Sequence, residues 1–178
     1  MIKTFKSKRG NDVIFRYPTK NDFSSVWKFA CDLAAEDTFI LLNKAPTEKE
    51  EHQWFDDVLE KVEKKESIHI SVFVNGEFAG NGRVDRGKYR QHHVGHVGLS
   101  LAPQYRQEGI GTELMKSLID EARRLCLRLL TLSCFENNPR ALFVYEKLGF
   151  RRFGVLPQAI AFQGKYIGEV HFYLPLAR

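Results

Sequence analysis

Apolar and polar positions along the chain follow two different periods. Seven segments show period-two alternation or a short apolar run, which is typical of β-strands. They span residues 12–17, 68–74, 77–84, 94–101, 129–135, 150–156 and 169–176. Four other segments repeat apolar residues at helical spacing, and they span residues 23–33, 47–65, 110–125 and 141–148. The pattern therefore predicts an α/β chain.

Local signals set the limits of some of these elements. Thr47 and Glu50 form a capping box that begins the second helix. Asn75-Gly76 is the signature of a tight turn between two antiparallel strands. Residues 35–46 show no clean period, so we expect an irregular segment between the first two helices, of the kind that often shapes a pocket.

The elements follow one another as a strand, two helices, three strands, a helix, a strand, a helix and two strands. This order predicts a three-layer α/β/α fold in which helices cover both faces of a mixed seven-stranded sheet. A chain of 178 residues can bury a sizeable core in one domain. We therefore expect a single domain over residues 1–178.

Composition narrows the class of protein. No apolar run approaches the roughly 20 residues that a membrane span needs. Residues 3–9 are basic, but no apolar signal core follows them, so we expect a cytoplasmic protein. The cysteines, which show neither disulfide nor zinc spacing, are Cys31, Cys126 and Cys134. The net charge is +5, but the basic residues are spread through the chain and alternate with acidic ones. We therefore expect a polyanionic small molecule rather than nucleic acid as the partner.

The stretch that carries the chemistry leads from the strand at residues 94–101 into the third helix. Gly109 and Gly111 allow main-chain N–H groups to come close to a bound group, and the helix beginning there adds its positive dipole end. This arrangement suits an anion, most often a phosphate. The alternative is an ordinary glycine turn, since a lone Gly-x-Gly is a weak signal.

Two motifs in this order resemble the GNAT superfamily of acetyl-CoA-dependent N-acetyltransferases. The first is Arg106-Gln107-Glu108-Gly109-Ile110-Gly111, and the second combines Asn138-Pro139-Arg140-Ala141, Tyr145 and Gly149-Phe150. Residues 164–170 look like the final hairpin of the branch that acetylates amino acids, small amines or protein N-termini. The resemblance implies a mostly antiparallel sheet whose central parallel strand pair splays apart, with acetyl-CoA as co-substrate and no metal.

The resemblance also implies roles for individual residues. The expected acetyl-CoA contacts are Leu99, Ser100, Leu101, Arg106, Gln107, Glu108, Gly109, Ile110, Gly111, Thr112, Asn138 and Tyr145. The loop would hold the pyrophosphate, and the edge of the splayed strand would pair with the pantetheine amides. Tyr145 matches the acid that protonates the departing thiolate, and a main-chain N–H at Leu101 or its neighbour would hold the oxyanion. Tyr145 could instead be a packing residue, and Asn138 a helix cap.

The general base and the acceptor site are less sharply marked. His93 and His96 begin the strand that leads to the loop, and histidine titrates near neutral pH, so we rank them ahead of Glu36 and Asp37 as the base. Glu36, Asp37 and Phe39 are the candidate acceptor contacts. His92-His93-x-x-His96 lacks the further ligands of a metal site, so we expect none.

Other functions fit part of the pattern. A noncatalytic acyl-CoA-binding sensor or interaction module would keep the loop without the chemistry, and a tRNA- or nucleotide-binding domain would use the positive charge. A dinucleotide-binding fold is disfavoured, because the first glycine of Gly-x-Gly-x-x-Gly is absent. We expect no membrane partner, and the pattern leaves both a monomer and a homodimer open.

Overall fold

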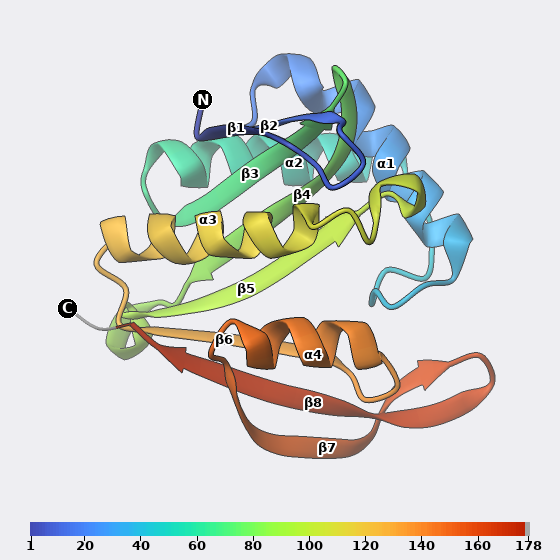
Figure 1. Cartoon of the computed structure of the whole chain (residues 1–178), viewed down its shortest axis with the longest axis vertical. Coiled ribbons are helices and arrows are strands. Elements are labelled where there is room, and N and C mark those ends of the chain that lie inside the picture. Colours follow the sequence, from blue (N-terminus) through green and yellow to red (C-terminus); the bar gives the residue numbers. More distant parts are fainter. Residues whose placement is uncertain (177–178) are drawn as a thin grey trace.

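The computed structural model describes residues 1–176 and shows one mixed sheet of eight strands with helices on both faces (Figure 1). Across the sheet the strand order is β1-β2-β3-β4-β5-β6-β8-β7. The strands are β1 (Lys3–Lys6), β2 (Asp12–Arg16), β3 (Ser67–Val74), β4 (Glu77–Arg86), β5 (Val94–Leu101), β6 (Leu129–Phe135), β7 (Arg151–Phe162) and β8 (Lys165–Pro175). The α-helices are α1 (Phe23–Glu36), α2 (Glu48–Glu63), α3 (Ile110–Arg124) and α4 (Pro139–Lys147).

Neighbouring strands are antiparallel everywhere except at the centre, where β5 and β6 run parallel. These two strands pair over three residues, Val94 with Leu129, Gly95 with Leu130 and His96 with Thr131. Beyond His96 the two strands diverge, while β5 stays paired with β4 as far as Leu101. The divergence opens the sheet between the second half of β5 and the second half of β6.

The main core lies between the sheet and α3. Leu114 and Leu118 of α3 lie over Gly82 of β4, where an added Cβ would come within about 3 Å of both side chains. Tyr145 and Leu148 of α4 pack against the same core. Helices α1 and α2 lie behind the sheet in Figure 1, with Phe29 of α1 packed against Phe78 of β4. The predicted three-layer arrangement is confirmed.

The structure differs from the predicted elements at three places. Residues 3–6 form an extra edge strand, β1, which the sequence shows only as a basic segment. The last two strands are longer than predicted, because β7 and β8 continue as a twisted hairpin past irregularities at residues 152–154 and 156–160. Helix α1 runs through Glu36, so that residue ends a helix rather than lying in the irregular segment.

Two local predictions, a capping box and a tight turn, are confirmed by the geometry. Thr47 and Glu50 form the capping box that begins α2. Asn75 and Gly76 have φ angles of 50° and 86°, as a type I′ turn requires. Within residues 1–176, no helix is long and apolar enough to cross a membrane.

Candidate active site

The predicted phosphate loop connects β5 to α3 and presents a row of main-chain N–H groups. Six consecutive N–H groups, from Gln107 to Thr112, have no hydrogen-bond acceptor among residues 1–176, and the first helical bond of α3 is donated by Glu113 to Gly109. Gln107 and Gly109 have positive φ angles, 65° and 84°, which turn the chain tightly into the helix. Unpaired N–H groups at the positive end of a helix form a site for an anion.

Two side chains of this loop point elsewhere. The Arg106 guanidinium forms a bidentate ion pair with Glu36 at the end of α1, and its Nε donates to the Leu101 carbonyl at 2.8 Å. The Glu108 carboxylate is buried and turns toward the turn between β1 and β2. Both side chains are thus engaged within the protein. The Glu108 N–H remains in the unpaired row, whereas the Arg106 N–H donates to the Pro103 carbonyl.

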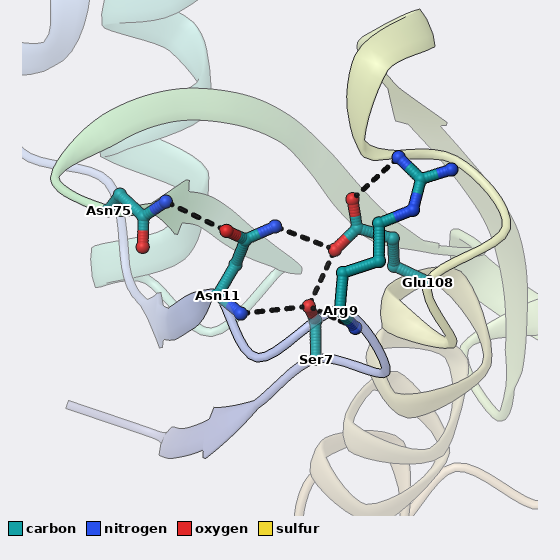
Figure 2. Close-up of polar contacts among 5 residues, drawn as sticks. All are labelled: Ser7, Arg9, Asn11, Asn75 and Glu108. Atoms are coloured by element: carbon teal, nitrogen blue, oxygen red, sulfur yellow. Dashed lines mark hydrogen bonds and ion pairs between the residues drawn. The ribbon is translucent and has the colours of Figure 1, made fainter.

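Figure 2 shows how Glu108 is held. Its Oε2 accepts hydrogen bonds from the Ser7 hydroxyl at 2.5 Å and from the Asn11 amide at 2.9 Å, and Arg9 lies 3.5 Å from Oε1. The hydrogen bond from Ser7 holds the pKa of this carboxyl below its usual range, with support from Asn11 and Arg9. Asn75 in turn donates to Asn11 at 3.0 Å. The loop is thus fastened to the N-terminal hairpin.

Next to the loop, the second half of β5 pairs with β4 but not with β6. Leu99, Ser100 and Leu101 pair with Gly82, Asn81 and Gly80 of β4 on one side only. Along an antiparallel strand, alternate residues bond to one neighbour, so the intervening main-chain groups of this stretch face the gap toward β6. These groups are not used in pairing with β6.

Tyr145 on α4 packs against β8 and lies near Cys134 of β6, one of the two strands that enclose the gap. Its ring packs against Phe150 and Phe172, with centroid distances of 6.1 Å and 5.9 Å. Burial raises the pKa of its hydroxyl, and the neighbouring Cys134 thiol of β6 adds to the effect. The hydroxyl makes no hydrogen bond within the described part of the chain, so its proton is free to be donated to a bound group.

Asn138 precedes α4 and caps it. Its Oδ1 accepts a hydrogen bond from the Ala141 N–H at 3.2 Å, as the helix-cap interpretation predicts. The side-chain NH₂ group has no acceptor within residues 1–176. One amide can therefore cap the helix and donate to a ligand in the gap.

The two candidate histidines are placed differently. His96 is exposed and forms the last pair of β5 with β6, where its Nδ1 lies 2.6 Å from Thr131 Oγ1. His93 precedes β5, its ring packs on His92, and its carbonyl accepts from Arg128 and Leu129. His96 thus lies where the strands begin to diverge, whereas His93 lies beyond the closed end of the gap.

A second polar group lies on the same face of the sheet and was missed from the sequence. Ser133 of β6 donates to Glu169 of β8 at 2.5 Å, and His171 Nε2 lies 3.4 Å from the other oxygen of Glu169. The strand register places Ser133 opposite His171. The alternation of polar residues at 169, 171 and 173 was the available signal, but alternation alone does not show which face is open.

Two of the three predicted acceptor residues lie at the open end of the gap. The Phe39 ring packs against Phe135 of β6 and Phe162 of β7, at 5.8 Å and 5.3 Å. Asp37 borders a cavity of about 200 Å³. The cavity is lined by Asp37, Thr38, Ile40, Leu41, Leu42, Asn43, Phe135, Ala159, Ile160, Ala161 and Phe162. Glu36 instead supports Arg106.

Other hollows and clusters on the surface lack such chemistry. A larger hollow of about 690 Å³ lies along the start of α2 and is lined by exposed polar residues far from the β5–β6 gap. Within residues 1–176, no three His, Cys, Asp or Glu side chains are close enough to hold a metal ion. The three cysteines are free thiols.

Comparison with known proteins points in the same direction. The model of the acetyltransferase (GNAT) family matches residues 29–150. The fold is similar to an acetyltransferase of the GNAT family from Streptococcus pneumoniae, with a TM-score of 0.83 and 21% identity, covering 92% of this chain and 99% of that one. It is also similar to yncA, a putative acetyltransferase from Salmonella typhimurium solved with its cofactor acetyl-CoA, with a TM-score of 0.81 and 17% identity over 93% and 94% of the two chains.

A third similar structure is a ribosomal-protein-alanine N-acetyltransferase from Brucella melitensis. Its TM-score is 0.81 at 20% identity, and the match covers 92% of this chain and 99% of that one. At these identities the solved structures establish a shared fold, and the family match rests on the sequence of residues 29–150.

Proposed function

Because the chain belongs to the acetyltransferase (GNAT) family, we propose that it transfers the acetyl group of acetyl-CoA to a primary amine by direct attack in a ternary complex. The observation that carries the proposal is the row of six unpaired N–H groups beside a sheet that opens between parallel strands. The row suits a pyrophosphate and the strand edge suits the amides of pantetheine. The two features are adjacent, so one extended ligand can occupy both.

The residues of the loop fit acetyl-CoA in detail. Gly109 adopts a left-handed conformation that a side chain would strain, and Gly111 is the second residue of α3 and lies within the N–H row. Bound acetyl-CoA supplies an acetyl thioester, whose carbonyl carbon accepts the amine nitrogen while its carbon–sulfur bond breaks. Gap-facing N–H groups of β5, at Leu101 or its neighbour, would hold the developing oxyanion.

We assign the general base to His96. A primary amine has a solution pKa of about 10.4 and arrives protonated, so the site must remove a proton before attack. The hydrogen bond with Thr131 fixes the orientation of the imidazole, and with the Nδ1 proton donated to Thr131, Nε2 remains free to accept a proton from the amine. His93 lacks such a position and is the weaker candidate.

Tyr145 is the proposed acid. Its raised pKa keeps the hydroxyl protonated at neutral pH, and the proton has no acceptor within residues 1–176. Donation of this proton to the departing thiolate leaves Tyr145 ionised, and the second proton that nitrogen loses as the amide forms restores the hydroxyl. The first proton of the ammonium has gone to His96, which passes it to solvent.

The acceptor amine is proposed to enter from the face that carries His96 and Glu169. At the open end of the gap, eight of the eleven residues that line the cavity are apolar, and Asp37, Thr38 and Asn43 add polar groups. We therefore propose an amine that carries a compact apolar group, as an amino acid or a peptide N-terminus does. Glu169, held by Ser133, provides a carboxylate on the same face that attracts the ammonium form.

Wider features of the protein are proposed on the same basis. We propose that residues 1–178 form one N-acetyltransferase domain, since α1, the loop and β8 all contribute to one site. The free thiols fit a reducing compartment, so we propose that the protein works in the cytoplasm. The test of the function is an acetyl-transfer assay with acetyl-CoA and a panel of free amino acids, polyamines, aminoglycosides and N-terminal peptides.

A noncatalytic acyl-CoA sensor is the second candidate. The same loop and strand edge would bind the coenzyme, and the ordered Thr131–His96 pair would then serve only to close the sheet. Tight binding of coenzyme A with no transfer to any amine of the panel would favour this function.

A further inference from the structure

The turn between β1 and β2 lies directly on the phosphate loop, although about 100 residues separate them in the sequence. The Lys8 N–H donates to the Glu108 carbonyl at 3.0 Å, and Ser7 and Asn11 hold the Glu108 carboxylate, as Figure 2 shows. The turn is itself ordered by hydrogen bonds from Ser7 N–H to the Asn11 carbonyl and from Gly10 N–H to the Ser7 carbonyl, both at 2.9 Å. The position of the turn relative to the loop is therefore fixed.

This docking lays the Lys8 side chain across the first residue of the helix. A Cβ built on Gly109 would lie 3.5 Å from Lys8 Cε, 3.6 Å from Cγ and 3.8 Å from Cδ. The aliphatic stem thus runs over Gly109, the N-cap of α3 and the third residue of the Gln107–Thr112 N–H row. The ammonium group is bonded to the Cε atom of that stem, so it is within reach of the row.

Lys8 differs from the other cations around the loop. Lys3 and Lys116 both pair with Glu113, and Arg106 pairs with Glu36. Lys8 is exposed and has no ion pair or side-chain hydrogen bond within residues 1–176. The cations nearby are already neutralised by the protein, and Lys8 is left with its charge.

A lysine near the N-terminus of α3 is electrostatically unfavourable in the free protein. Cations are favoured near a helix C-terminus and disfavoured near the N-terminus, where the dipole is positive. A lysine beside an unpaired N–H row therefore gathers like charges in the free protein. A bound polyanion removes this repulsion, because it attracts the ammonium and the N–H groups together.

Glu108 does not oppose such a ligand. Its carboxylate is buried against the turn between β1 and β2 and is satisfied by Ser7, Asn11 and Arg9. The only acidic residue within the loop thus serves to fasten the turn instead of repelling a phosphate.

We propose that Lys8 is a coenzyme-binding residue, whose ammonium group contacts the pyrophosphate of acetyl-CoA at the rim of the Gln107–Thr112 N–H row. The inference rests on the proposed function, because it assumes that this row holds the pyrophosphate. It assigns part of the coenzyme site to an N-terminal segment that lies outside the residues matched by the family model.

The test measures binding to the free protein by isothermal titration calorimetry, with coenzyme A and with dephospho-coenzyme A, which keeps the pyrophosphate and lacks the 3′-phosphate. For Lys8→Ala we expect the dissociation constants of both ligands to rise by about tenfold, the loss of one charge-assisted contact. Lys8→Arg keeps the charge and should restore most of the affinity. Lys6→Ala is the matched control, since Lys6 lies on the same hairpin but pairs with Asp12.

Two results would overturn the inference. Unchanged affinity of Lys8→Ala for both ligands would show that the ammonium makes no contact. A loss confined to coenzyme A would place Lys8 at the 3′-phosphate instead of the pyrophosphate. Failure of the coenzyme site itself is distinguished from both, because the wild-type protein would then bind neither ligand. Failure of catalysis alone would leave both affinities in place and would appear only in the acetyl-transfer assay.

Discussion

His96 and Thr131 form the last residue pair of the parallel strands β5 and β6, and 2.6 Å separates His96 Nδ1 from Thr131 Oγ1. This hydrogen bond sits at the closed end of the gap that the two strands enclose. It orients the His96 imidazole at the point where β5 and β6 begin to diverge. The proposed proton transfer from the amine depends on this position.

Replacing His96 tests the base directly. We expect His96→Gln to lower kcat/KM by about 100-fold or more, because a positioned general base contributes roughly that factor, while the dissociation constant of coenzyme A stays within about twofold. His93→Gln is the control and should retain near-normal activity, since His93 lies outside the gap. The measurement is steady-state kinetics across pH. Equal losses in the two variants would remove His96 as the base.

Tyr145→Phe tests the acid. The substitution keeps the ring that packs on Phe150 and Phe172, so we expect the fold and the coenzyme affinity to be retained while kcat falls by about 10-fold to 100-fold. Because burial raises the pKa of Tyr145, the wild-type rate should show no loss from its ionisation up to about pH 9. A variant with the wild-type kcat across the pH range would exclude Tyr145 as the acid.

Gly109→Glu tests the loop. A left-handed φ of 84° costs an L-residue roughly 1–2 kcal/mol, and the added side chain would begin against the Lys8 stem and bring a negative charge to the N–H row. We expect coenzyme A binding to be lost in calorimetry while circular dichroism shows a folded protein. Gly154→Glu introduces the same side chain on β7, where a Cβ meets no atom within 4 Å, and should bind normally. Normal binding by Gly109→Glu would contradict the loop assignment.

The ion pair between Arg106 and Glu36 is tested first through the stability of the protein. Their ion pair joins the loop to α1 and is about 30% exposed, so we expect a coupling free energy of about 1 kcal/mol in a double-mutant cycle of urea unfolding. Arg106→Ala and Glu36→Ala should also affect coenzyme A affinity alike, since both release the same contact. A much larger loss of affinity in Arg106→Ala would instead show that its guanidinium binds phosphate.

The attachment of the N-terminal hairpin to Glu108 is expected to weaken in acid. The hydrogen bond from Ser7 holds the pKa of Glu108 below its usual value, so the folded state favours the ionised carboxylate. Its contribution to stability is present above the unfolded pKa of about 4.3 and is lost as the pH falls through the lower folded value. Glu108→Gln should therefore show a smaller loss of unfolding free energy between about pH 5 and pH 3 than the wild type. Identical pH slopes would contradict this role.

Much of the fold could be predicted from the sequence because its signals are local. The alternation in residues 94–101 and 129–135 and the capping box at Thr47 depend on near neighbours, and the structure confirms the limits of β5 and β6. The edge strand β1 was missed because Lys3–Lys6 is short and basic, and it becomes a strand only by pairing with β2. The long β7–β8 hairpin was missed because irregular register interrupts its alternation.

Only the part of the site that is formed by main-chain groups could be predicted from the sequence. The loop glycines mark where N–H groups are free, and that feature is visible in the sequence. The partners of Arg106, Glu108 and Lys8 come from segments 70 to 101 residues away, so no local pattern reveals them. The same holds for Ser133 and Glu169, which meet only because β6 pairs with β8.

The central claim is that this chain transfers acetyl groups to an amine. The most direct measurement is the release of free coenzyme A thiol from acetyl-CoA in the presence of each amine of the panel, with the acetylated product identified by mass spectrometry. We predict release that requires both the protein and at least one primary amine, that is strongest for amines with a compact apolar group, and that Tyr145→Phe slows. Saturable coenzyme A binding without amine-dependent thiol release for any member of the panel would contradict the account and favour the sensor function.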